Sequence, residues 1–276
     1  MKFGLALPYN QTHQAALWAQ EAEESGWDGL FFGDAIWCED PMIGIAAAAA
    51  ATNQIRLGTM VIPVPLRSPW KIASEALALD HLSDGRIILG LGTGATWMGW
   101  QSFPDEVTDQ KTRREMLDET IDILTLLFQS KPFDFEGNQY HIKLTLLDEM
   151  YYPRKPVQLP RIPLWIPAIW PQEKSIQHAL KCDGLILEKR NNAGEPEEIT
   201  PKDVCEVKEY TVEKGSPSIP FDIVVEGKSF DLDLVQRRDK ATRLKEAGAT
   251  WWIEGLWGET PETVIDCIRH GPPINN

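Results

Sequence analysis

Short apolar runs alternate with longer amphipathic segments along most of the chain. The apolar runs have the length and side-chain mix of buried β-strands, and the amphipathic segments repeat their apolar positions at helical spacing. The predicted strands are residues 3–7, 29–33, 55–62, 87–91, 164–166, 184–187, 221–225 and 250–253. The predicted helices are a stretch ending near residue 25, one through the alanine run 46–51, and 70–83, 110–129, 172–182, 201–214, 232–247 and 261–270.

The alternation breaks once, between the fourth predicted helix and the fifth predicted strand. Residues 133–147, around the turn Glu136-Gly137-Asn138, are typical of a small hairpin. Residues 151–163 contain four prolines, which exclude a regular element there. We therefore expect a small hairpin insertion followed by an irregular connection.

Eight strands and eight helices in 276 residues give about 34 residues per strand–helix unit. Strands that alternate with helices pair in parallel, and eight such units are typical of a (β/α)8 barrel. A doubly wound open sheet is the alternative with the same alternation. No Pro-, Gly- or Ser-rich linker divides the chain, so we predict a single domain over residues 1–276.

Composition and charge narrow the function classes. A hydrophobic fraction of 43% and a charged fraction of 25% are those of a folded globular protein. The chain has 27 Lys and Arg against 41 Asp and Glu, and its net charge of −14 disfavours nucleic acids and anionic membranes as partners. No apolar stretch approaches the roughly 20 residues of a membrane span, and the first apolar run is too short for a signal peptide. Four scattered cysteines without metal spacing are typical of reduced thiols in a cytoplasmic protein: Cys38, Cys182, Cys205 and Cys267.

The glycine-rich run Gly90-Leu-Gly-Thr-Gly94-Ala95 fits the G-x-G-x-x-A spacing of dinucleotide-binding turns. A Rossmann site needs an acidic residue at the end of the next strand, and here a long helix follows, so we reject that interpretation. Glycines at the end of a strand still allow backbone amides to approach an anion. The run is therefore either a phosphate-binding turn or a tight turn without a ligand.

Carboxylates follow four of the predicted strands, where the active sites of a barrel lie. They are Asp34, Glu188, Glu226 and Glu254. Two of them facing each other would suit glycosidase-type acid–base catalysis. Alternatively, they cap helices or pair with Lys189, Arg190 and Lys228.

Aromatic residues and histidines indicate less about a possible active site. Most of the 11 tryptophans are expected in the core. The pair Trp251-Trp252 lies in the last predicted strand, so one ring should point into the barrel and the other toward the helices. The five histidines lack metal-ligand spacing, and His81 and His178 fall inside predicted helices as structural or exposed residues.

Three segments resemble the family of bacterial luciferase-like, flavin-dependent monooxygenases and oxidoreductases. Residues 22–34 (AEESGWDGLFFGD) resemble the end of the first helix and the second strand of that family. Residues 55–65 (IRLGTMVIPVP) and 79–94 (LDHLSDGRIILGLGTG) resemble its third strand, third helix and fourth strand in order and spacing. The resemblance is dense over residues 3–128 and returns at 162–168, 179–187 and 247–254.

This resemblance implies a (β/α)8 barrel that binds FMN, or in a related branch the deazaflavin coenzyme F420, at its C-terminal mouth. It implies a non-prolyl cis peptide behind the flavin ring at Met60–Val61, and a phosphate site formed by the turn after the fourth strand together with residues 169–174. The cofactor-binding residues implied are Met60, Val61, Thr93, Gly94, Ala168, Ile169, Trp170 and Gln172. Tryptophans expected to line a dry substrate pocket are Trp37, Trp97, Trp170 and Trp257. Asp34 and Glu254 are the expected catalytic residues.

The chain departs from the family pattern at three places. Asp34 is followed by Ala35, where many members carry histidine, and Gly94 is followed by Ala95, where deazaflavin members often carry glutamate. The Gly-Gly usual after the fifth strand is replaced at residues 168–169. These differences favour FMN over the deazaflavin coenzyme.

We therefore expect a cytoplasmic, monooxygenase-like oxidoreductase that uses FMN or reduced FMN on a small, largely apolar organic substrate. Expected partners are a second copy of the chain and a flavin reductase, with no metal, nucleic acid or membrane. Three alternatives stay open: deazaflavin-dependent hydride transfer, a non-catalytic flavin-binding barrel, and a carboxylate-based barrel hydrolase.

Overall fold

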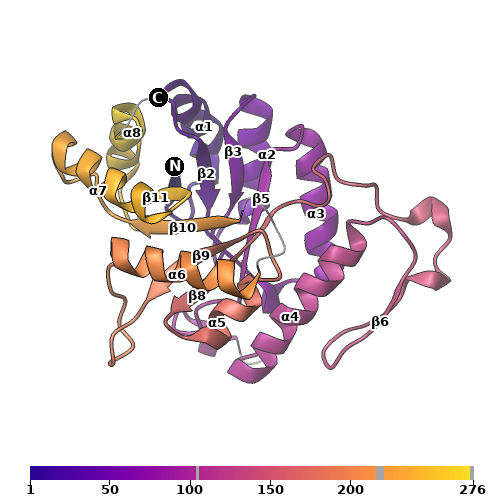
Figure 1. Cartoon of the computed structure of the whole chain (residues 1–276). Coiled ribbons are helices and arrows are strands. Elements are labelled where there is room, and N and C mark those ends of the chain that lie inside the picture. The colour runs from indigo at the N-terminus through magenta and orange to yellow at the C-terminus, as the bar shows by residue number, and fades with distance from the viewer. Residues whose placement is uncertain (104–105, 216–220, 274–276) are drawn as a thin grey trace.

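Parallel strands close into a barrel in the computed structural model of the chain (Figure 1). The structure describes residues 1–103, 106–215 and 221–273. The strands around the barrel are β1 (Lys2–Leu7), β2 (Gly29–Phe32), β3 (Arg56–Thr59) continued by β4 (Ile62–Pro63), β5 (Ile87–Gly92), β8 (Leu164–Trp170), β9 (Gly184–Lys189), β10 (Asp222–Gly227) and β11 (Trp251–Gly255). Because β1 pairs with β11 and β3 pairs with β5, the sheet closes on itself. The (β/α)8 barrel is confirmed, and the open doubly wound sheet is excluded.

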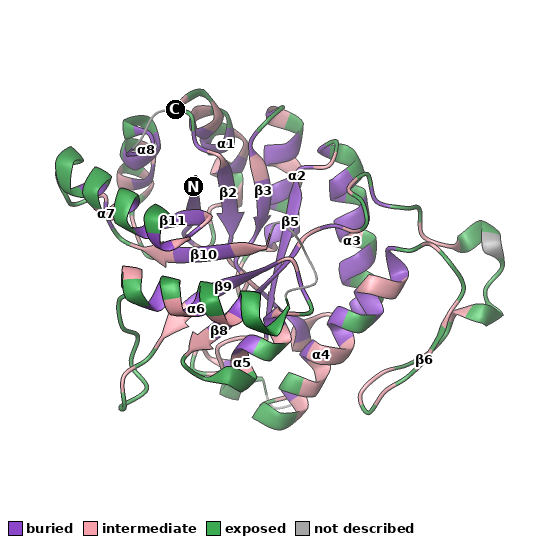
Figure 2. Cartoon of the chain, viewed as in Figure 1, coloured by how far each residue is buried: buried purple, intermediate pink, exposed green. Residues whose placement is uncertain are grey.

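The helices surround this barrel and bury one side against it. They are α1 (Ala15–Glu24), α2 (Pro41–Ala51), α3 (Pro69–Leu82), α4 (Gln110–Leu127), α5 (Glu173–Ala179), α6 (Pro201–Lys214), α7 (Leu234–Ala247) and α8 (Pro261–His270). Figure 2 shows buried residues on the helix sides that face the strands and exposed residues on the outer sides. Within the described ranges, no helix has the length and apolar character needed to cross a membrane.

The fifth strand and the helix after it differ from the prediction in length. β8 was expected to end at residue 166, but it stays paired with β9 from Trp165 through Trp170. α5 was expected to reach residue 182, yet it ends at Ala179. The turn that follows it brings the amide of Asp183 to the carbonyl oxygen of Leu164, which starts the next strand pairing.

Aromatic side chains fill the barrel interior. Trp165 stacks on Phe31 with ring centroids 5.2 Å apart and meets the ring of Trp251 edge-on at 5.3 Å. Trp251 belongs to this inner cluster, whereas Trp252 packs in the layer between strands and helices, so their predicted opposite orientations are confirmed. The interior is a packed core, and the strand ends are left as the place for a ligand.

The third barrel strand is interrupted where the resemblance implied it. The sequence pattern predicts one strand over residues 55–62, but the structure divides it into β3 and β4. Between them lies a cis peptide bond, Met60–Val61. Gly90 on β5 makes room for the displaced backbone, because a Cβ there would lie 2.2 Å from the carbonyl oxygen of Thr59.

The predicted hairpin insertion is confirmed as an antiparallel pair outside the barrel. β6 (Asp134–Glu136) and β7 (His141–Lys143) project from the α4 side of the molecule (Figure 1). The carboxylate of Glu119 on α4 accepts hydrogen bonds from the backbone amides of Asn138, Gln139 and Tyr140. One side chain of α4 thus fixes the turn of the insertion.

A second carboxylate, that of Glu23 in the last turn of α1, holds the loop that enters β3. It accepts hydrogen bonds from the amides of Asn53, Gln54 and Ile55. Burial acts to raise the pKa of Glu23, but the three amide donors keep that pKa below its usual value. A depressed carboxyl pKa contributes stability above the unfolded-state pKa, and this contribution is lost as the pH falls through the folded-state pKa.

We expect Glu23→Gln to lower the free energy of unfolding by about 1 kcal/mol at neutral pH, and by progressively less as the solution becomes acidic. Urea unfolding over a pH series measures this difference. Glu24→Gln changes the exposed neighbour and serves as the matched control. A loss for Glu23→Gln that is the same at every pH would contradict the role given to the carboxylate charge.

Candidate active site

The main cavity lies at the carboxyl ends of β4, β5, β8 and β9 and is closed on the outside by α4 and α5. Its volume is about 570 Å³. Its walls consist of Val61, Gly92, Thr93, Gly94, Ala95, Thr96, Trp97, Gln110, Arg113, Arg114, Leu117, Ile166, Pro167, Ile169, Gln172, Lys174, Ser175, His178, Glu188 and Arg190. It is therefore placed where active sites of this fold occur.

The turn after β5 lines this cavity. The buried guanidinium of Arg113 on α4 donates hydrogen bonds to the carbonyl oxygens of Thr93 and Gly94 and lies 4.2 Å from the ring centroid of Trp100. The backbone amides of residues 94–96 donate to no other described residue. Gly94 has a φ of +75°, which glycine adopts without steric cost. The turn is thus held by its carbonyls, and its amides stay available.

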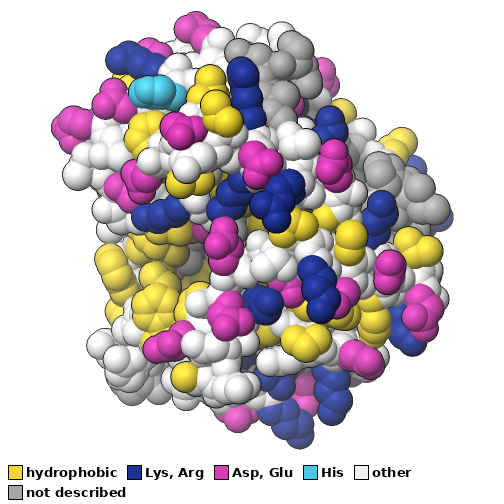
Figure 3. Space-filling model, turned by 60° about the vertical axis from the view of Figure 1, so that its left-hand side comes forward, with side chains coloured by type: hydrophobic (Ala, Val, Ile, Leu, Met, Phe, Trp, Pro, Cys, Tyr) yellow, Lys and Arg dark blue, Asp and Glu magenta, His cyan; other side chains and the backbone are white. Residues whose placement is uncertain are grey.

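Cationic side chains gather on the outer wall of the cavity. Arg114 comes from α4, Lys174 from α5, and Arg190 from the end of β9. Together with Arg113, they make four positively charged side chains that line the cavity. Glu188 is the single carboxylate among its lining residues. On the face shown in Figure 3, basic and acidic side chains are interspersed. This wall is a local positive region in a chain of net charge −14, and it favours an anionic ligand group.

A histidine also belongs to this wall. The ring Nδ1 of His178 on α5 is hydrogen-bonded to a carboxylate oxygen of Asp118 on α4. The pair bridges the two helices that close the cavity. His178 lies in a helix, as predicted, but it borders the cavity and is not merely structural or exposed.

Beside the cavity, over the barrel axis, three side chains form the floor of the mouth. The indole N–H of Trp257 donates a hydrogen bond to Glu226, and its ring stacks on Tyr9 with centroids 5.3 Å apart. Burial raises the pKa of Tyr9 to about 12 and also raises the pKa of Glu226. The predicted pocket residue Trp257 is therefore in the mouth, next to a carboxyl group that burial favours in its neutral form.

The predicted catalytic residue Asp34 does not line the cavity. Its carboxylate is buried in an ion pair with Arg67 at 3.0 Å, and Arg67 also contacts Asp40 and Glu75. Burial raises the pKa of Asp34, and the neighbouring Arg67 opposes that rise. The alternative that the strand-end carboxylates form ion pairs thus describes Asp34, although the sequence pattern did not indicate Arg67 as its partner.

The other predicted catalytic residue, Glu254, faces away from the mouth. Trp251 and Ile253 point into the barrel, so Glu254 points outward with Trp252. The carboxylate is buried and accepts hydrogen bonds from the amide and hydroxyl of Ser229, from the amide of Phe230 and from the indole of Trp252. It anchors the loop after β10, so the structure does not bring Asp34 and Glu254 together.

Some of the predicted cofactor residues line the cavity and others do not. Five of them line the cavity: Val61, Thr93, Gly94, Ile169 and Gln172. Met60 packs in the barrel interior, and Ala168 and Trp170 face outward, because alternate residues of β8 point to opposite sides. The indole of Trp170 donates to Glu206 on α6, so this side chain is not in the pocket.

The two remaining tryptophans lie at the rim. Trp97 lines the cavity but is 79% exposed, and Trp37 is 56% exposed with its indole donating to the carbonyl oxygen of Met98. The expected dry aromatic pocket is therefore open at this rim. Sequence reasoning included Lys174 in the implied phosphate segment 169–174 but missed Arg113, Arg114 and His178 as cavity residues. Adjacent arginines at the start of the helix after the glycine run were the available signal for the first two.

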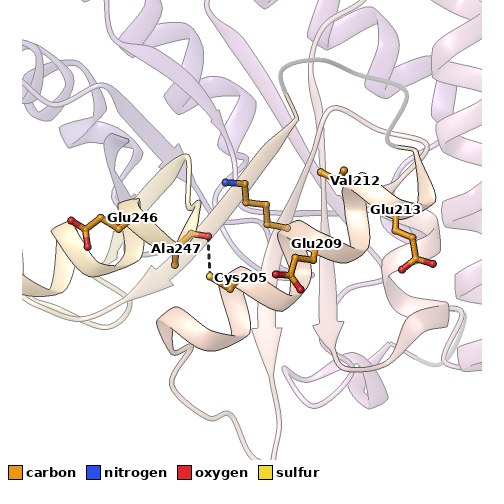
Figure 4. Close-up of a pocket in the computed structure, with 7 residues that line it drawn as sticks. Cys205, Glu209, Val212, Glu213, Glu246 and Ala247 are labelled. Atoms are coloured by element: carbon orange, nitrogen blue, oxygen red, sulfur yellow. Dashed lines mark hydrogen bonds between the residues drawn. The ribbon is translucent and has the colours of Figure 1, made fainter.

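A second hollow, of about 420 Å³, lies between α6 and α7 (Figure 4). Its lining residues are Cys205, Lys208, Glu209, Val212, Glu213, Glu246 and Ala247. It opens on the helical surface away from the strand ends, and the thiol of Cys205 contacts the carbonyl oxygen of Ala247. Among the described residues, no group of His, Cys, Asp and Glu could hold a metal ion. The cavity at the strand ends is therefore the candidate active site.

Comparisons with known proteins identify related sequences and folds. Residues 1–227 match the family model described as luciferase-like monooxygenase. A putative coenzyme F420-dependent oxidoreductase of Mycobacterium tuberculosis (strain ATCC 25618 / H37Rv) is 37% identical over 155 residues, 52% of this chain and 42% of that protein. The 4-hydroxyprotoasukamycin monooxygenase of Streptomyces nodosus subsp. asukaensis is 40% identical over 79 residues, 29% of this chain and 19% of that protein. The chain thus matches less than half the length of either relative.

Solved structures share the fold over almost the whole chain. The coenzyme F420-dependent tetrahydromethanopterin reductase from Methanopyrus kandleri superposes with a TM-score of 0.74 at 17% identity, covering 98% of both chains. A monooxygenase from Streptomyces bottropensis gives a TM-score of 0.73 at 18% identity, covering 98% of this chain and 97% of that one. At such identities the likeness concerns the fold.

Proposed function

Because this chain belongs to the luciferase-like monooxygenase family, we propose that it is an oxidoreductase that binds a flavin or deazaflavin cofactor in the cavity at its strand ends. Within that class we propose reduced FMN as the cofactor and a small, largely apolar organic molecule as the substrate. A flavin reductase that supplies reduced FMN, and a second copy of the chain, complete the proposal.

The observation that carries the proposal is that one cavity is lined both by a turn whose amides donate to no described residue and by cationic side chains. The amides of residues 94–96 and the side chains of Arg114 and Lys174 suit a phosphate group. The volume of about 570 Å³ lies within the usual range for sites of small molecules and cofactors. The residues present therefore fit a phosphorylated cofactor.

The other walls suit a planar ring. Val61, which follows the cis bond, packs on the inner cluster and on Gly92, where a Cβ would lie 2.8 Å from its side chain. This leaves an apolar back wall without side chains that project from β5. The cofactor supplies the redox chemistry when it is bound, and the task of this chain is to orient it and to limit water at the reacting face.

The deazaflavin coenzyme is the second candidate, and one observation favours it. Four positively charged side chains line the cavity. This is more positive charge than is needed to neutralise a single phosphate group. One of the similar proteins is described as F420-dependent, and another as a monooxygenase. Ala95, which stands where deazaflavin-dependent members often carry glutamate, favours FMN instead. A binding measurement with each cofactor therefore decides between them.

The test compares binding of FMN, riboflavin and coenzyme F420 to the purified chain by absorbance and fluorescence titration. We expect FMN to bind at least tenfold more tightly than riboflavin, which lacks the phosphate; this corresponds to about 1.4 kcal/mol. Preference for coenzyme F420 would favour the second candidate. Binding of none of the three would overturn the proposal.

A further inference from the structure

Two glutamates stand side by side on the floor of the mouth. Val224 on β10 and Ile186 on β9 both point into the barrel, so Glu226 and Glu188, two residues further on, point inward at its open end. The register pairs Val225 with Leu187, and therefore the two glutamates follow as neighbours on adjacent strands. The fold thus places two carboxyl groups at cross-strand contact distance above the packed interior.

The two carboxyl groups have unequal partners. Glu188 forms an ion pair with Arg190 at 3.1 Å. Glu226 accepts one hydrogen bond from the indole of Trp257, and no described Lys, Arg or His forms an ion pair with it. Burial raises the pKa of Glu226, and the neighbouring Glu188 raises it further. When two carboxylates share a site and only one has a cation, the other retains the proton.

A glycine on the neighbouring strand leaves room for the carboxyl group of Glu226. A Cβ at Gly255 on β11 would lie 2.7 Å from the carboxyl oxygen that accepts from Trp257. The other titratable groups near Glu226 come from the loops after β1 and β2. Tyr9 is the one beside Glu226, and Asp34 and Cys38 lie near Tyr9. Asp34 is paired with Arg67, and the pKa of Cys38 is raised by burial to about 11, so neither the thiol nor the phenol supplies a charge at neutral pH.

We propose that Glu226 is the proton donor of this active site, kept neutral by its neighbour Glu188 and oriented by Trp257. In the step, the O–H bond of Glu226 would break as an O–H bond forms on a carbonyl oxygen of the substrate, while the carbonyl carbon would accept a hydride equivalent and the C=O π bond would break; solvent then returns a proton to the carboxylate. The electrons come from the flavin or deazaflavin cofactor, so the catalytic part of this inference rests on the proposed function. The resting proton on Glu226 is a property of the cofactor-free chain.

Carbon-13 NMR of the cofactor-free chain, labelled at the glutamate carboxyl carbon, tests that resting proton. We expect one resonance to titrate well above the ordinary glutamate pKa of about 4.3, and to be lost in Glu226→Gln. Glu188→Gln removes the like charge and should lower the titration midpoint of this resonance. Trp257→Phe removes the donor that favours the carboxylate and should raise it.

Glu209→Gln, on the outer surface of α6, is the matched control and should leave this midpoint unchanged. The proposal is overturned if the resonance of Glu226 titrates in the ordinary range, or if Glu188→Gln does not lower its midpoint. The Glu188 and Trp257 variants keep the test decisive if Glu226→Gln does not fold.

Turnover gives the second readout once a cofactor has been identified. We expect Glu226→Gln to lower kcat by about 100-fold or more while cofactor affinity stays unchanged. Unchanged kcat in that variant would remove Glu226 from proton transfer even if its resting proton is confirmed. Failure of the wild-type chain to bind any flavin would refute the proposed function, whereas the NMR titration would still decide the state of Glu226.

Discussion

Replacing Arg86 with methionine is expected to lower the free energy of unfolding by about 3 kcal/mol or more. This side chain is buried, and its guanidinium donates five hydrogen bonds. The acceptors are the carbonyl oxygens of Ala49, Thr52, Ile55 and Ser83 and the hydroxyl of Thr52. Arg86, which directly precedes β5, thereby supplies hydrogen-bond donors to carbonyl groups at the carboxyl end of α2 and in the loop that enters β3.

Methionine fills much of the same space but donates nothing, so several buried carbonyl groups would lose their partner. Lysine at position 86 keeps the charge but donates from one point, and we expect it to recover only part of the loss. Urea unfolding measures both variants. Arg243→Met, at an exposed arginine of α7, is the control and should change the free energy of unfolding by less than about 0.5 kcal/mol. A result for Arg86→Met within that range would refute the role given to this residue.

The second large effect is expected at the cationic wall. Reversing two charges in the double variant Arg114→Glu, Lys174→Glu should weaken binding of the phosphorylated cofactor by roughly tenfold to thirtyfold. Both side chains line the cavity and are exposed, so the effect should shrink at high salt. Fluorescence titration at low and high ionic strength measures it.

Riboflavin provides the internal comparison for this variant. Because riboflavin carries no phosphate, its affinity should change much less than that of FMN. Lys202→Glu, at an exposed lysine of α6 that does not line the cavity, is the control for a single charge reversal outside the cavity. Equal losses for FMN and riboflavin would show that the wall does not recognise the phosphate.

The barrel could be predicted from the sequence because each of its elements carries a local signal. Helix starts have capping side chains such as Asp40, Asp109 and Thr200, and their apolar periods match the buried sides. The interruption of the third strand carries no such signal, since the sequence pattern predicts one strand over residues 55–62. Only the resemblance indicated the cis bond at Met60–Val61.

The site was predicted less well because strand ends are readable but side-chain direction and ion pairing are not. Successive residues of a strand point to opposite faces, so a position at a strand end does not show by itself that Glu254 and Trp170 point outward. Arg67, which engages Asp34, lies more than 30 residues away in sequence and belongs to another loop. The cations of α4 and α5 converge only because the barrel closes and brings these helices to one cavity.

The acidic and basic side chains of the mouth occupy different places. Their separation bears on the direction in which an elongated ligand binds. Glu188 and Glu226 lie over the barrel axis, whereas Arg114 and Lys174 lie at the outer wall. We expect a molecule with an uncharged head and an anionic tail to bind head first, because the reverse pose would set its anion beside the carboxylate of Glu188 and away from Arg114 and Lys174. For the same reason, we expect compounds that are anionic at both ends to bind less tightly in either pose, so that the site selects ligands by polarity along their length as well as by shape.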